Sequence, residues 1–353
     1  MIRNANITVV AEYIWLDNQQ NFRSKIKIFT KDVCELKNSL YPSLILDIFP
    51  QWNFDGSSTA QSETHNSDLI LNPIYCCTNP FYKNTNENRM YLYVLCEVLN
   101  SDLTPHSTNT YHILNSNEFS KDESIWFGIE QEYMLFSENS EQLYRYTDFY
   151  NKEKHNKYYC GVGASRVFGR EISEKHMNLC LDAGLKICGI NAEVTPSQWE
   201  FQLGPLPPME MANQLWLARY ILTIMCEAFN VEIKFHPKPF SDLNGSGAHT
   251  NFSTEAMRED GGMEKILEAI EKLKLKHDVD IKLYGIDNER RLTGKNETSS
   301  YDKFTFGNSD RGSSIRIPLN VQLEGKGYFE DRRPAANMDP YLVINSMLTT
   351  IMN

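Results

Sequence analysis

Two glutamates one residue apart interrupt an apolar run in FGIEQEYML, residues 127–135. In an extended strand, side chains two positions apart share a face, so Glu130 and Glu132 would lie side by side while their neighbours take the other face. Removing two like charges from water is costly unless cations or hydrogen-bond donors compensate. The stretch therefore predicts a core strand, one face of which meets a partner with concentrated positive charge.

Four further residues with metal-binding side chains have unusual surroundings. Glu193 and Glu200 lie in GINAEVTPSQWEFQLGP, and Glu330 lies in GYFEDRRPAAN. His249 lies in NGSGAHTNFS, where small residues let the backbone approach a ligand closely. Each alone is most often an ion-paired or structural residue. Together with the first pair they suit Mg²⁺ or Mn²⁺, and they are numerous enough for more than one ion.

Arginines form a second group towards the end of the chain: Arg290, Arg291, Arg311, Arg316, Arg332 and Arg333. Arg316 alternates with Ile315 and Ile317 in a strand-like run, where a buried guanidinium needs an anionic partner. Divalent cations with arginines commonly hold a polyphosphate and neutralise a transferring phosphoryl group. The two groups predict a metal-dependent enzyme that uses ATP, and they leave its acceptor open.

Other common sites lack support in the sequence. The glycines of YYCGVGAS do not continue into GxGxxG, and the chain has no Walker lysine loop and no GxSxG elbow. A glycosidase would use a carboxylate pair, but it hydrolyses without a metal cluster, which leaves the arginines and His249 unexplained.

The composition is that of a soluble globular protein of 353 residues, 41% hydrophobic and 23% charged. The net charge of −11 argues against nucleic-acid binding as the main function. The eight cysteines show no CxxC spacing, so we expect free thiols in a reducing, cytoplasmic location. The N-terminal apolar run resembles a first strand rather than a signal peptide, and no transmembrane span is expected.

The elements that must position these residues divide at a polar stretch near Pro105. Residues 7–100 are rich in short β-prone segments, without a long amphipathic helix. Beyond the stretch, one helix is predicted from an N-cap at Ser173 to a stop near Gly184, and another over 209–229. A third helix is predicted from a stripe made of Met263, Ile266, Leu267, Ile270 and Leu273. Strands between these helices make the second part α+β.

Seven motifs, in order, resemble glutamine synthetases of the shorter eukaryotic type: WNFDGSSTAQSETHNSD, WFGIEQEYMLF, YYCGVGASRVFGRE, NAEVTPSQWEFQLGP, KPFSDLNGSGAHTNFSTEAMRE, NERRLTGKNETSS and GYFEDRRPAANMDP. The resemblance covers nearly the whole chain. It implies an α+β fold, with a small β-grasp domain over residues 1–102 and a catalytic domain over residues 103–353. The second domain would carry a curved antiparallel sheet flanked by helices. The resemblance also implies a homodecamer of two pentameric rings, with active sites between neighbouring subunits.

The resemblance assigns roles position by position. The metal ligands it implies are Glu130, Glu132, Glu193, Glu200, His249 and Glu330. The glutamate-binding residues are Asn244, Gly245, Arg291 and Arg332, and the residues that line the nucleotide pocket are Trp126, Pro205, Asn251, Ser253, Arg258, Arg316 and Tyr328. The catalytic groups are Asp55, Glu297, Arg311 and Arg332.

The implied reaction is the ligation of ammonium to L-glutamate, with ATP as co-substrate and Mg²⁺ or Mn²⁺ as cofactor. A carboxylate is a poor electrophile, so ATP first converts it to γ-glutamyl phosphate, and ammonia then displaces phosphate. Asp55 resembles the family's aspartate that binds ammonium and takes its proton. Glu297 resembles the glutamate of a flap, whose closure completes the cation pocket and excludes water.

Two residues depart from the family pattern: Asn296 stands where His is common, and Asp310 precedes Arg311 where Asn is usual. Two alternatives stay open. One is γ-glutamylation of another amine, against which Asp55 and Glu297 argue. The other is a structural relative without catalysis, which the complete set of metal ligands disfavours.

Overall fold

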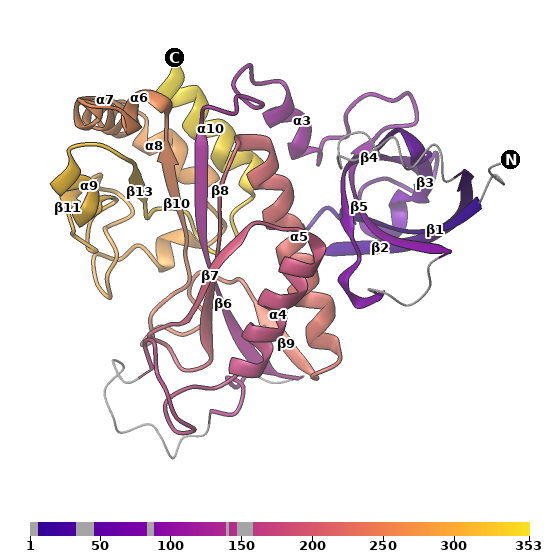
Figure 1. Cartoon of the computed structure of the whole chain (residues 1–353), viewed down its shortest axis with the longest axis horizontal. Coiled ribbons are helices and arrows are strands. Elements are labelled where there is room, and N and C mark those ends of the chain that lie inside the picture. Colours follow the sequence, from indigo (N-terminus) through magenta and orange to yellow (C-terminus); the bar gives the residue numbers. More distant parts are fainter. Residues whose placement is uncertain (1–5, 33–45, 83–87, 139–140, 147–157) are drawn as a thin grey trace, which may run out of the picture. The chain divides into compact units, whose positions relative to one another are not determined.

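The computed structural model describes residues 6–32, 46–82, 88–138, 141–146 and 158–353. The chain forms two compact units, both visible in Figure 1: unit 1 is Met1–Ile113 with Leu179–Leu185, and unit 2 is Leu114–Asn178 with Lys186–Asn353. Strands and helices are both present, so the fold is α+β as predicted. The domain boundary after residue 102 stays a prediction.

Unit 1 contains a five-stranded sheet with the order β2-β1-β5-β4-β3 among its described residues. The strands are β1 (Asn6–Leu16), β2 (Phe22–Asp32), β3 (Trp52–Asp55), β4 (Asp68–Thr78) and β5 (Arg89–Leu99), with 3₁₀ turns η1 (Leu46–Ile48), η2 (Gly56–Thr59) and η3 (Pro80–Tyr82). β1 is parallel to β5 and antiparallel to β2, which fits a β-grasp. The pattern did not predict β4, because Pro73 breaks its alternation, and a shift in register follows that residue.

Unit 2 contains a larger sheet with the order β11-β12-β13-β10-β6-β8-β7, and β9 also pairs with β6. Its strands are β6 (Trp126–Ser137), β7 (Ile187–Ala192), β8 (Gln198–Leu206), β9 (Val231–Lys234), β10 (Ala248–Ser253), β11 (Phe306–Asn308), β12 (Ile315–Ile317) and β13 (Phe329–Asp331). All the pairs are antiparallel except β11 with β12. Figure 1 shows the long strands β6, β8 and β10 at the centre of this sheet.

The helices of the described residues are α3 (Thr110–Asn115), α4 (Arg170–Ala183), α5 (Pro208–Glu227), α6 (Glu255–Arg258), α7 (Gly262–Leu275), α8 (His277–Asp280), α9 (Leu319–Glu324) and α10 (Pro340–Met352), with 3₁₀ turns η6 (Ile281–Leu283) and η7 (Asn288–Arg290). α5 confirms the helix predicted over 209–229 and is almost wholly buried, as a helix packed between a sheet and α10 must be. Its burial accounts for its apolar sequence.

One detail of the helix predictions was wrong. Ser173 is not an N-cap, because α4 already begins at Arg170, where the Gly169 carbonyl accepts the amide hydrogens of Ile172 and Ser173. α7 confirms the third helix, and of its predicted stripe Ile266, Ile270 and Leu273 are buried while Leu267 is 39% exposed.

The two faces of β6 differ as its alternation predicts. Ile129, Gln131 and Tyr133 are fully buried on the face opposite to the glutamates. The Gln131 Oε1 accepts hydrogen bonds from Arg219 of α5, at 2.9 Å from Nε and 2.6 Å from Nη2. Arg219 also donates to the carbonyl oxygens of Ala336 and Met338, both at 2.9 Å. A buried cation therefore lies behind the strand that carries the acidic pair.

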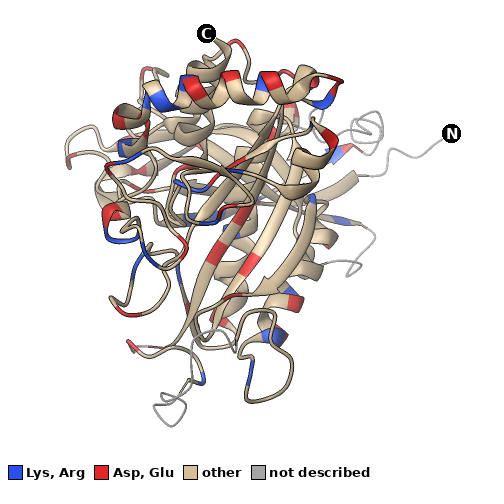
Figure 2. Cartoon of the chain, turned by 90° about the vertical axis from the view of Figure 1, so that its left-hand side faces the viewer, with Lys and Arg blue, Asp and Glu red and all other residues tan. Residues whose placement is uncertain are grey.

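Acidic residues also lie part-way along the long strands rather than only at their ends (Figure 2). Interior strand positions are usually apolar, so these acids indicate a site on the face of the sheet.

Seven of the predicted free thiols are confirmed as free cysteines, and Cys34 lies outside the described residues. Within the described ranges, no helix has both the length and the apolar character needed to cross a membrane.

The Arg219 network generates a first prediction. Arg219→Met removes the donors to Gln131 and to two buried carbonyl oxygens, and we expect it to lower the free energy of unfolding by about 3–5 kcal/mol. Arg290→Met is the matched control, because Arg290 is half exposed and pairs with Asp287 at 3.6 Å. The control should change stability by less than about 0.5 kcal/mol. Denaturant titration measures both, and equal losses would contradict the importance of the network.

Candidate active site

The register of the central strands brings predicted metal ligands face to face. Glu132 on β6 lies directly opposite Glu200 on β8, and Glu130 lies opposite His249 on β10. Directly paired side chains in an antiparallel sheet approach closely. Two groups result, in each of which the donor atoms lie within 4.8 Å of one another: Glu130, His249 and Glu330, and Glu132, Glu200 and His249.

Glu193 lies just beyond the end of β7, close enough to Glu132 to raise the pKa of that residue. Its carboxylate accepts hydrogen bonds from Asn191 Nδ2 at 2.9 Å and from the Val194 amide at 3.2 Å. The structure therefore brings all six predicted ligands to one face of the sheet.

Without a bound cation, the carboxyl groups of the cluster are not all ionised at neutral pH. Burial raises the pKa of Glu132 to about 8, of Glu193 to about 7 and of Glu200 to about 9, and the neighbouring carboxylates add to these shifts. Burial lowers the pKa of His249 well below its usual value, so its imidazole is neutral. Carboxylate oxygens with one neutral imidazole fit a divalent cation, which would supply the missing positive charge.

Glu330 is already paired with two arginines. Its Oε2 accepts from Arg316 Nη1 at 2.8 Å and its Oε1 from Arg332 Nη1 at 2.6 Å. The His249 Nδ1 is 3.5 Å from the same Oε1. A carboxylate has about four acceptor positions, so Glu330 can hold both arginines and still offer a lone pair to a cation.

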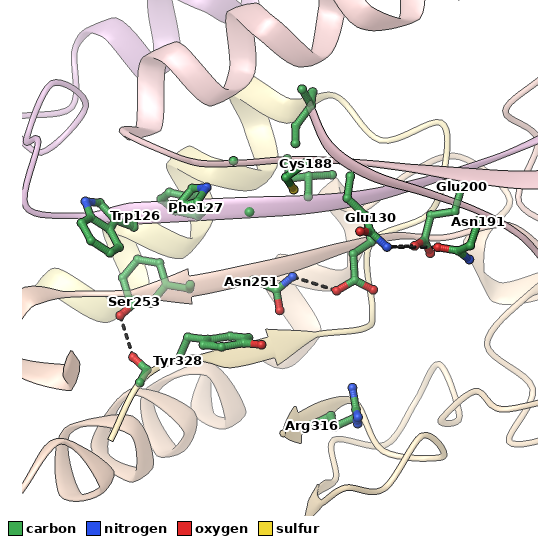
Figure 3. Close-up of a pocket in the computed structure, with 18 of the residues that line it drawn as sticks. Trp126, Phe127, Glu130, Cys188, Asn191, Glu200, Asn251, Ser253, Arg316 and Tyr328 are labelled. Carbon is green, nitrogen blue, oxygen red and sulfur yellow. Dashed lines mark hydrogen bonds between the residues drawn. The ribbon is translucent and has the colours of Figure 1, made fainter. Parts of the chain in front are cut away.

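A cavity of about 580 Å³ opens on one side of the acidic cluster. Its lining includes all seven residues predicted for the nucleotide pocket: Trp126, Pro205, Asn251, Ser253, Arg258, Arg316 and Tyr328. Figure 3 shows Trp126 and Ser253 at one end and Glu200 and Asn191 at the other. One end is therefore aromatic and the other highly charged, which suits a ligand with a flat ring and an ionic tail.

Hydrogen bonds fix the aromatic end. The guanidinium of Arg258 lies 3.7 Å from the centre of the Trp126 ring. Arg258 also donates to Ser253 Oγ at 3.2 Å and to the Ser124 carbonyl at 2.7 Å. The Ser253 hydroxyl donates to the Gly327 carbonyl at 2.6 Å (Figure 3). Trp126 is 41% exposed and lines the cavity, so its ring is oriented by Arg258 and still accessible to a ligand.

A smaller cavity adjoins the cluster, and Glu193 lines both cavities. Its lining includes the four predicted glutamate-binding residues, Asn244, Gly245, Arg291 and Arg332, together with Glu297 and Asn296. Gly245 is needed there, because a Cβ atom would lie 2.2 Å from the Pro237 carbonyl oxygen and 2.8 Å from the Arg291 Cγ. The cluster thus borders two cavities of different size and chemistry.

Glu297 lies in an exposed loop, where it and Asn296 adopt left-handed backbone angles of φ 62° and 53°. Two consecutive residues in this conformation are unfavourable without glycine, so surrounding contacts must hold the loop. One contact is the hydrogen bond from Arg332 Nη2 to the Glu297 carbonyl, at 3.3 Å.

Arg311 lines the larger cavity. The departure at Asp310 does not set a free charge beside it, because the Asp310 carboxylate accepts from the Gly312 amide at 2.8 Å and from Ser313 Oγ at 2.7 Å. These hydrogen bonds, Ser313 first, lower the pKa of Asp310.

Asp55 belongs to unit 1, whereas the other predicted site residues belong to unit 2. It is exposed at the end of β3 and accepts from Ser57 and Ser58 Oγ, both at 2.7 Å. These side-chain hydrogen bonds lower the pKa of Asp55 to about 2, so it is an anion at neutral pH.

Two of the six arginines do not line either cavity. Arg290 is half exposed and pairs with Asp287, and Arg333 is buried on the reverse face of β13, paired with Asp331.

The sequence reasoning missed two glutamines that join the site together. Gln198 Nε2 donates to the Gly245 carbonyl at 2.9 Å and lies 3.3 Å from Glu132 Oε2, so it connects a ligand to the loop of the smaller cavity. Gln202 Nε2 donates to Glu200 Oε1 at 2.6 Å. The signal was present, because Gln198, Glu200 and Gln202 alternate along β8 and must share a face.

Comparisons with known proteins agree on one family. The family profile described as "Glutamine synthetase, catalytic domain" matches residues 110–265. A Candida glabrata protein named glutamine synthetase is 48% identical over 348 residues, covering 98% of this chain and 89% of that protein. The Saccharomyces cerevisiae glutamine synthetase is also 48% identical, over 97% of this chain and 89% of its own length. Among solved structures, a cryo-EM structure of Plasmodium falciparum glutamine synthetase has a TM-score of 0.72, covering 100% of this chain and 73% of that chain at 17% identity, which is a likeness of fold.

The raised pKa values of the acidic cluster generate a second prediction. In the metal-free folded protein, Glu132 and Glu200 hold protons up to about pH 8 and 9 respectively, whereas in the unfolded chain they lose them near pH 4.5. The metal-free protein therefore loses stability as pH rises through this window, and within the window bound Mg²⁺ must displace the protons on Glu132 and Glu200. Thermal unfolding with Mg²⁺ or EDTA should show a larger rise in Tm with metal at about pH 8.5 than at about pH 6.

Glu200→Gln is the control for this prediction, because it removes one of the two carboxyls and should flatten the pH dependence of the metal effect. An equal rise in Tm at both pH values in the wild type would contradict the coupling between protons and metal.

Proposed function

The chain belongs to the glutamine synthetase family, and from this premise we propose that its two adjoining cavities hold ATP and L-glutamate on either side of the acidic cluster. It is an ATP-dependent glutamate–ammonia ligase, which forms glutamine, ADP and phosphate. Membership of the family also implies the use of a divalent metal ion. The observation that carries the assignment of the cavities is that Glu193 lines both of them, while Glu130 and Glu200 line the larger cavity and Glu132 and His249 line the smaller one.

ATP fits the larger cavity. Its adenine can stack on the exposed face of Trp126, and its phosphates can extend to the charged end, where Arg311 and Arg316 supply positive charge. The lining of the smaller cavity suits L-glutamate, because Arg332 and the backbone around Gly245 can hold its carboxylates. The γ-carboxylate would then lie close to the γ-phosphate of ATP, at the border between the cavities.

The reaction proceeds in two balanced steps. A γ-carboxylate oxygen of glutamate attacks the γ-phosphorus of ATP, the bond to the β-phosphate oxygen breaks, and ADP leaves with that electron pair. Ammonia then attacks the acyl carbon, the carbon–oxygen bond to phosphate breaks, and phosphate leaves with that electron pair and takes up the proton that the nitrogen loses on becoming an amide. The six predicted ligands would hold divalent metal, Mg²⁺ or Mn²⁺, which would supply positive charge for the phosphate groups when bound. Arg311 and Arg316 stabilise the charge on the transferring group.

Ammonium must lose a proton before its nitrogen can attack. An Asp55 carboxylate with a pKa near 2 suits binding a cation, but it is a weak proton acceptor. Covering Asp55 by a neighbouring subunit would remove water and raise this pKa, which would make it a better base. Its exposure in a single chain thus supports a site completed between subunits, with Glu297 on the loop that closes over it.

We also propose, from the family, a decamer of two pentameric rings in the cytoplasm, with residues 103–353 as the catalytic domain of each subunit. The buried cysteine thiols fit a reducing compartment.

The direct test is phosphate release and glutamine formation by the purified protein with ATP, glutamate and Mg²⁺, with ammonium or a panel of other amines. Glutamine formed in equal amount to phosphate, only with ammonium, supports the proposal. Product with another amine alone would overturn the ammonium assignment.

The third prediction separates the two cavities. Trp126→Ala should raise KM for ATP about tenfold and leave KM for glutamate unchanged, because base stacking on an aromatic ring is worth about 1–3 kcal/mol. Gly245→Ala should raise KM for glutamate about tenfold or more with little change for ATP, because its Cβ displaces the loop. Steady-state kinetics measure both, and the same pattern in both variants would contradict the assignment.

The fourth prediction concerns the shared site. Asp55→Ala and Arg311→Ala should each be nearly inactive alone. Mixed oligomers from co-expression should recover about one quarter of wild-type activity, because one site in four combines an intact Asp55 with an intact neighbouring cleft. No recovery in verified mixed oligomers would show that each site is built within one chain.

A further inference from the structure

β13 and the two residues after it carry different groups on their two faces. Glu330 and Arg332 face the acidic cluster, whereas Asp331 and Arg333 are fully buried on the reverse face. Arg333 donates twice to Asp331, from Nε to Oδ1 at 2.9 Å and from Nη2 to Oδ2 at 2.6 Å. This bidentate pair fixes the guanidinium, so the direction of its remaining amino group, Nη1, is also fixed.

Nη1 of Arg333 lies 3.1 Å from the Nδ1 of His277, a buried residue at the start of α8. A guanidinium is always a donor, so His277 Nδ1 must be the acceptor and the ring proton must be on Nε2. That Nε2 lies 2.9 Å from the carbonyl oxygen of Tyr301 and donates to it. His277 is therefore a neutral relay in one tautomer, with both ring nitrogens used.

Tyr301 stands at the base of the loop that carries Glu297. Its amide donates to the Leu292 carbonyl at 2.8 Å, and Thr293 pairs with Ser300 as an isolated bridge. The tip of the loop is held from the other face of the same strand region, by the Arg332 hydrogen bond to the Glu297 carbonyl. Loop 293–300 is thus tied at its tip by Arg332 and at its base by His277.

We propose that His277 is a positioning residue that locks the base of loop 293–300 to β13 and so fixes the point from which the loop carries Glu297 over the site. His277 is not among the residues that line either cavity, and it reaches the loop through its hydrogen bonds with Arg333 and Tyr301, while its ring packs edge-on against Phe304. Its contribution rests on the proposed function of the site, because a loose loop would admit water to the acyl phosphate. Water would then attack the phosphorylated intermediate, which gives glutamate and phosphate in place of glutamine.

The test compares a substitution of His277 that loses the hydrogen bond to Tyr301 with one that can keep it. In His277→Asn the side-chain oxygen can still accept from Arg333, but the amide is too short to reach Tyr301. In His277→Gln the longer amide can donate to the Tyr301 carbonyl through its nitrogen and accept from Arg333 through its oxygen, as the two ring nitrogens of His277 do. His176→Gln is the matched control, because His176 is also fully buried in unit 2 and bonds the Ala218 carbonyl at 2.9 Å, on α5 rather than on the loop.

Two readouts follow the loop and the reaction separately. The first is the rate of tryptic cleavage after the exposed Lys295, followed by mass spectrometry, which needs no activity. The second is the ratio of phosphate released to glutamine formed, with KM for ammonium. In His277→Asn we expect both the cleavage rate and the ratio to rise about fivefold, as the loss of one buried hydrogen bond implies. His277→Gln and His176→Gln should stay within about twofold of the wild type.

The proposal is overturned if His277→Asn cleaves at Lys295 no faster than His176→Gln, or if His277→Gln loosens the loop as much as His277→Asn. Faster cleavage without a change in the ratio would also overturn it, because the loop would then not protect the intermediate. If the wild type makes no glutamine, the proposed function is contradicted. The cleavage test would still show whether His277 holds the loop, because it needs no activity.

Discussion

The structure depends on one constraint: several carboxylates must lie on one face of a buried sheet, and the sheet must remain stable. The alternation of β6 does this by giving Glu130 and Glu132 one face and Gln131 the other, where Arg219 holds it from α5. Because β6 pairs with β8 and β10 in a fixed register, Glu200 and His249 must then face the first two glutamates. The high pKa values of Glu132, Glu193 and Glu200 follow first from burial and then from this crowding, and such a cluster suits a cation better than a set of surface ion pairs would.

On β13, arginines compensate the buried carboxylates. Glu330 is held by Arg316 and Arg332 on the site face, while the buried pair of Asp331 and Arg333 secures the reverse face. Both faces then reach the loop around Glu297, through Arg332 at its tip and through His277 at its base. The strand therefore connects the buried acidic cluster to the exposed loop.

Much of this could be predicted from the sequence, because its strongest signals are local and periodic. The pair of glutamates in an apolar strand, Arg316 between two isoleucines and the long helix α5 all follow from alternation or helical period. The seven motifs then led to residues that the structure gathers around two cavities. Contacts between distant segments could not be predicted, because no local pattern fixes them. Gln198 beside Gly245, Arg333 on the reverse face and the tautomer of His277 depend on register and on tertiary packing, as does the start of α4 at Arg170 rather than at Ser173.

The central claim is that the carboxylates facing one another on β6, β8, β10 and β13 form a cation site between two substrate cavities. The most direct measurement is anomalous diffraction from crystals of the protein soaked with Mn²⁺. The account predicts manganese peaks within the cluster of Glu130, Glu132, Glu193, Glu200, His249 and Glu330, which disappear in crystals of Glu132→Gln. Full occupancy elsewhere on the molecule, with no peak among these six residues, would contradict it.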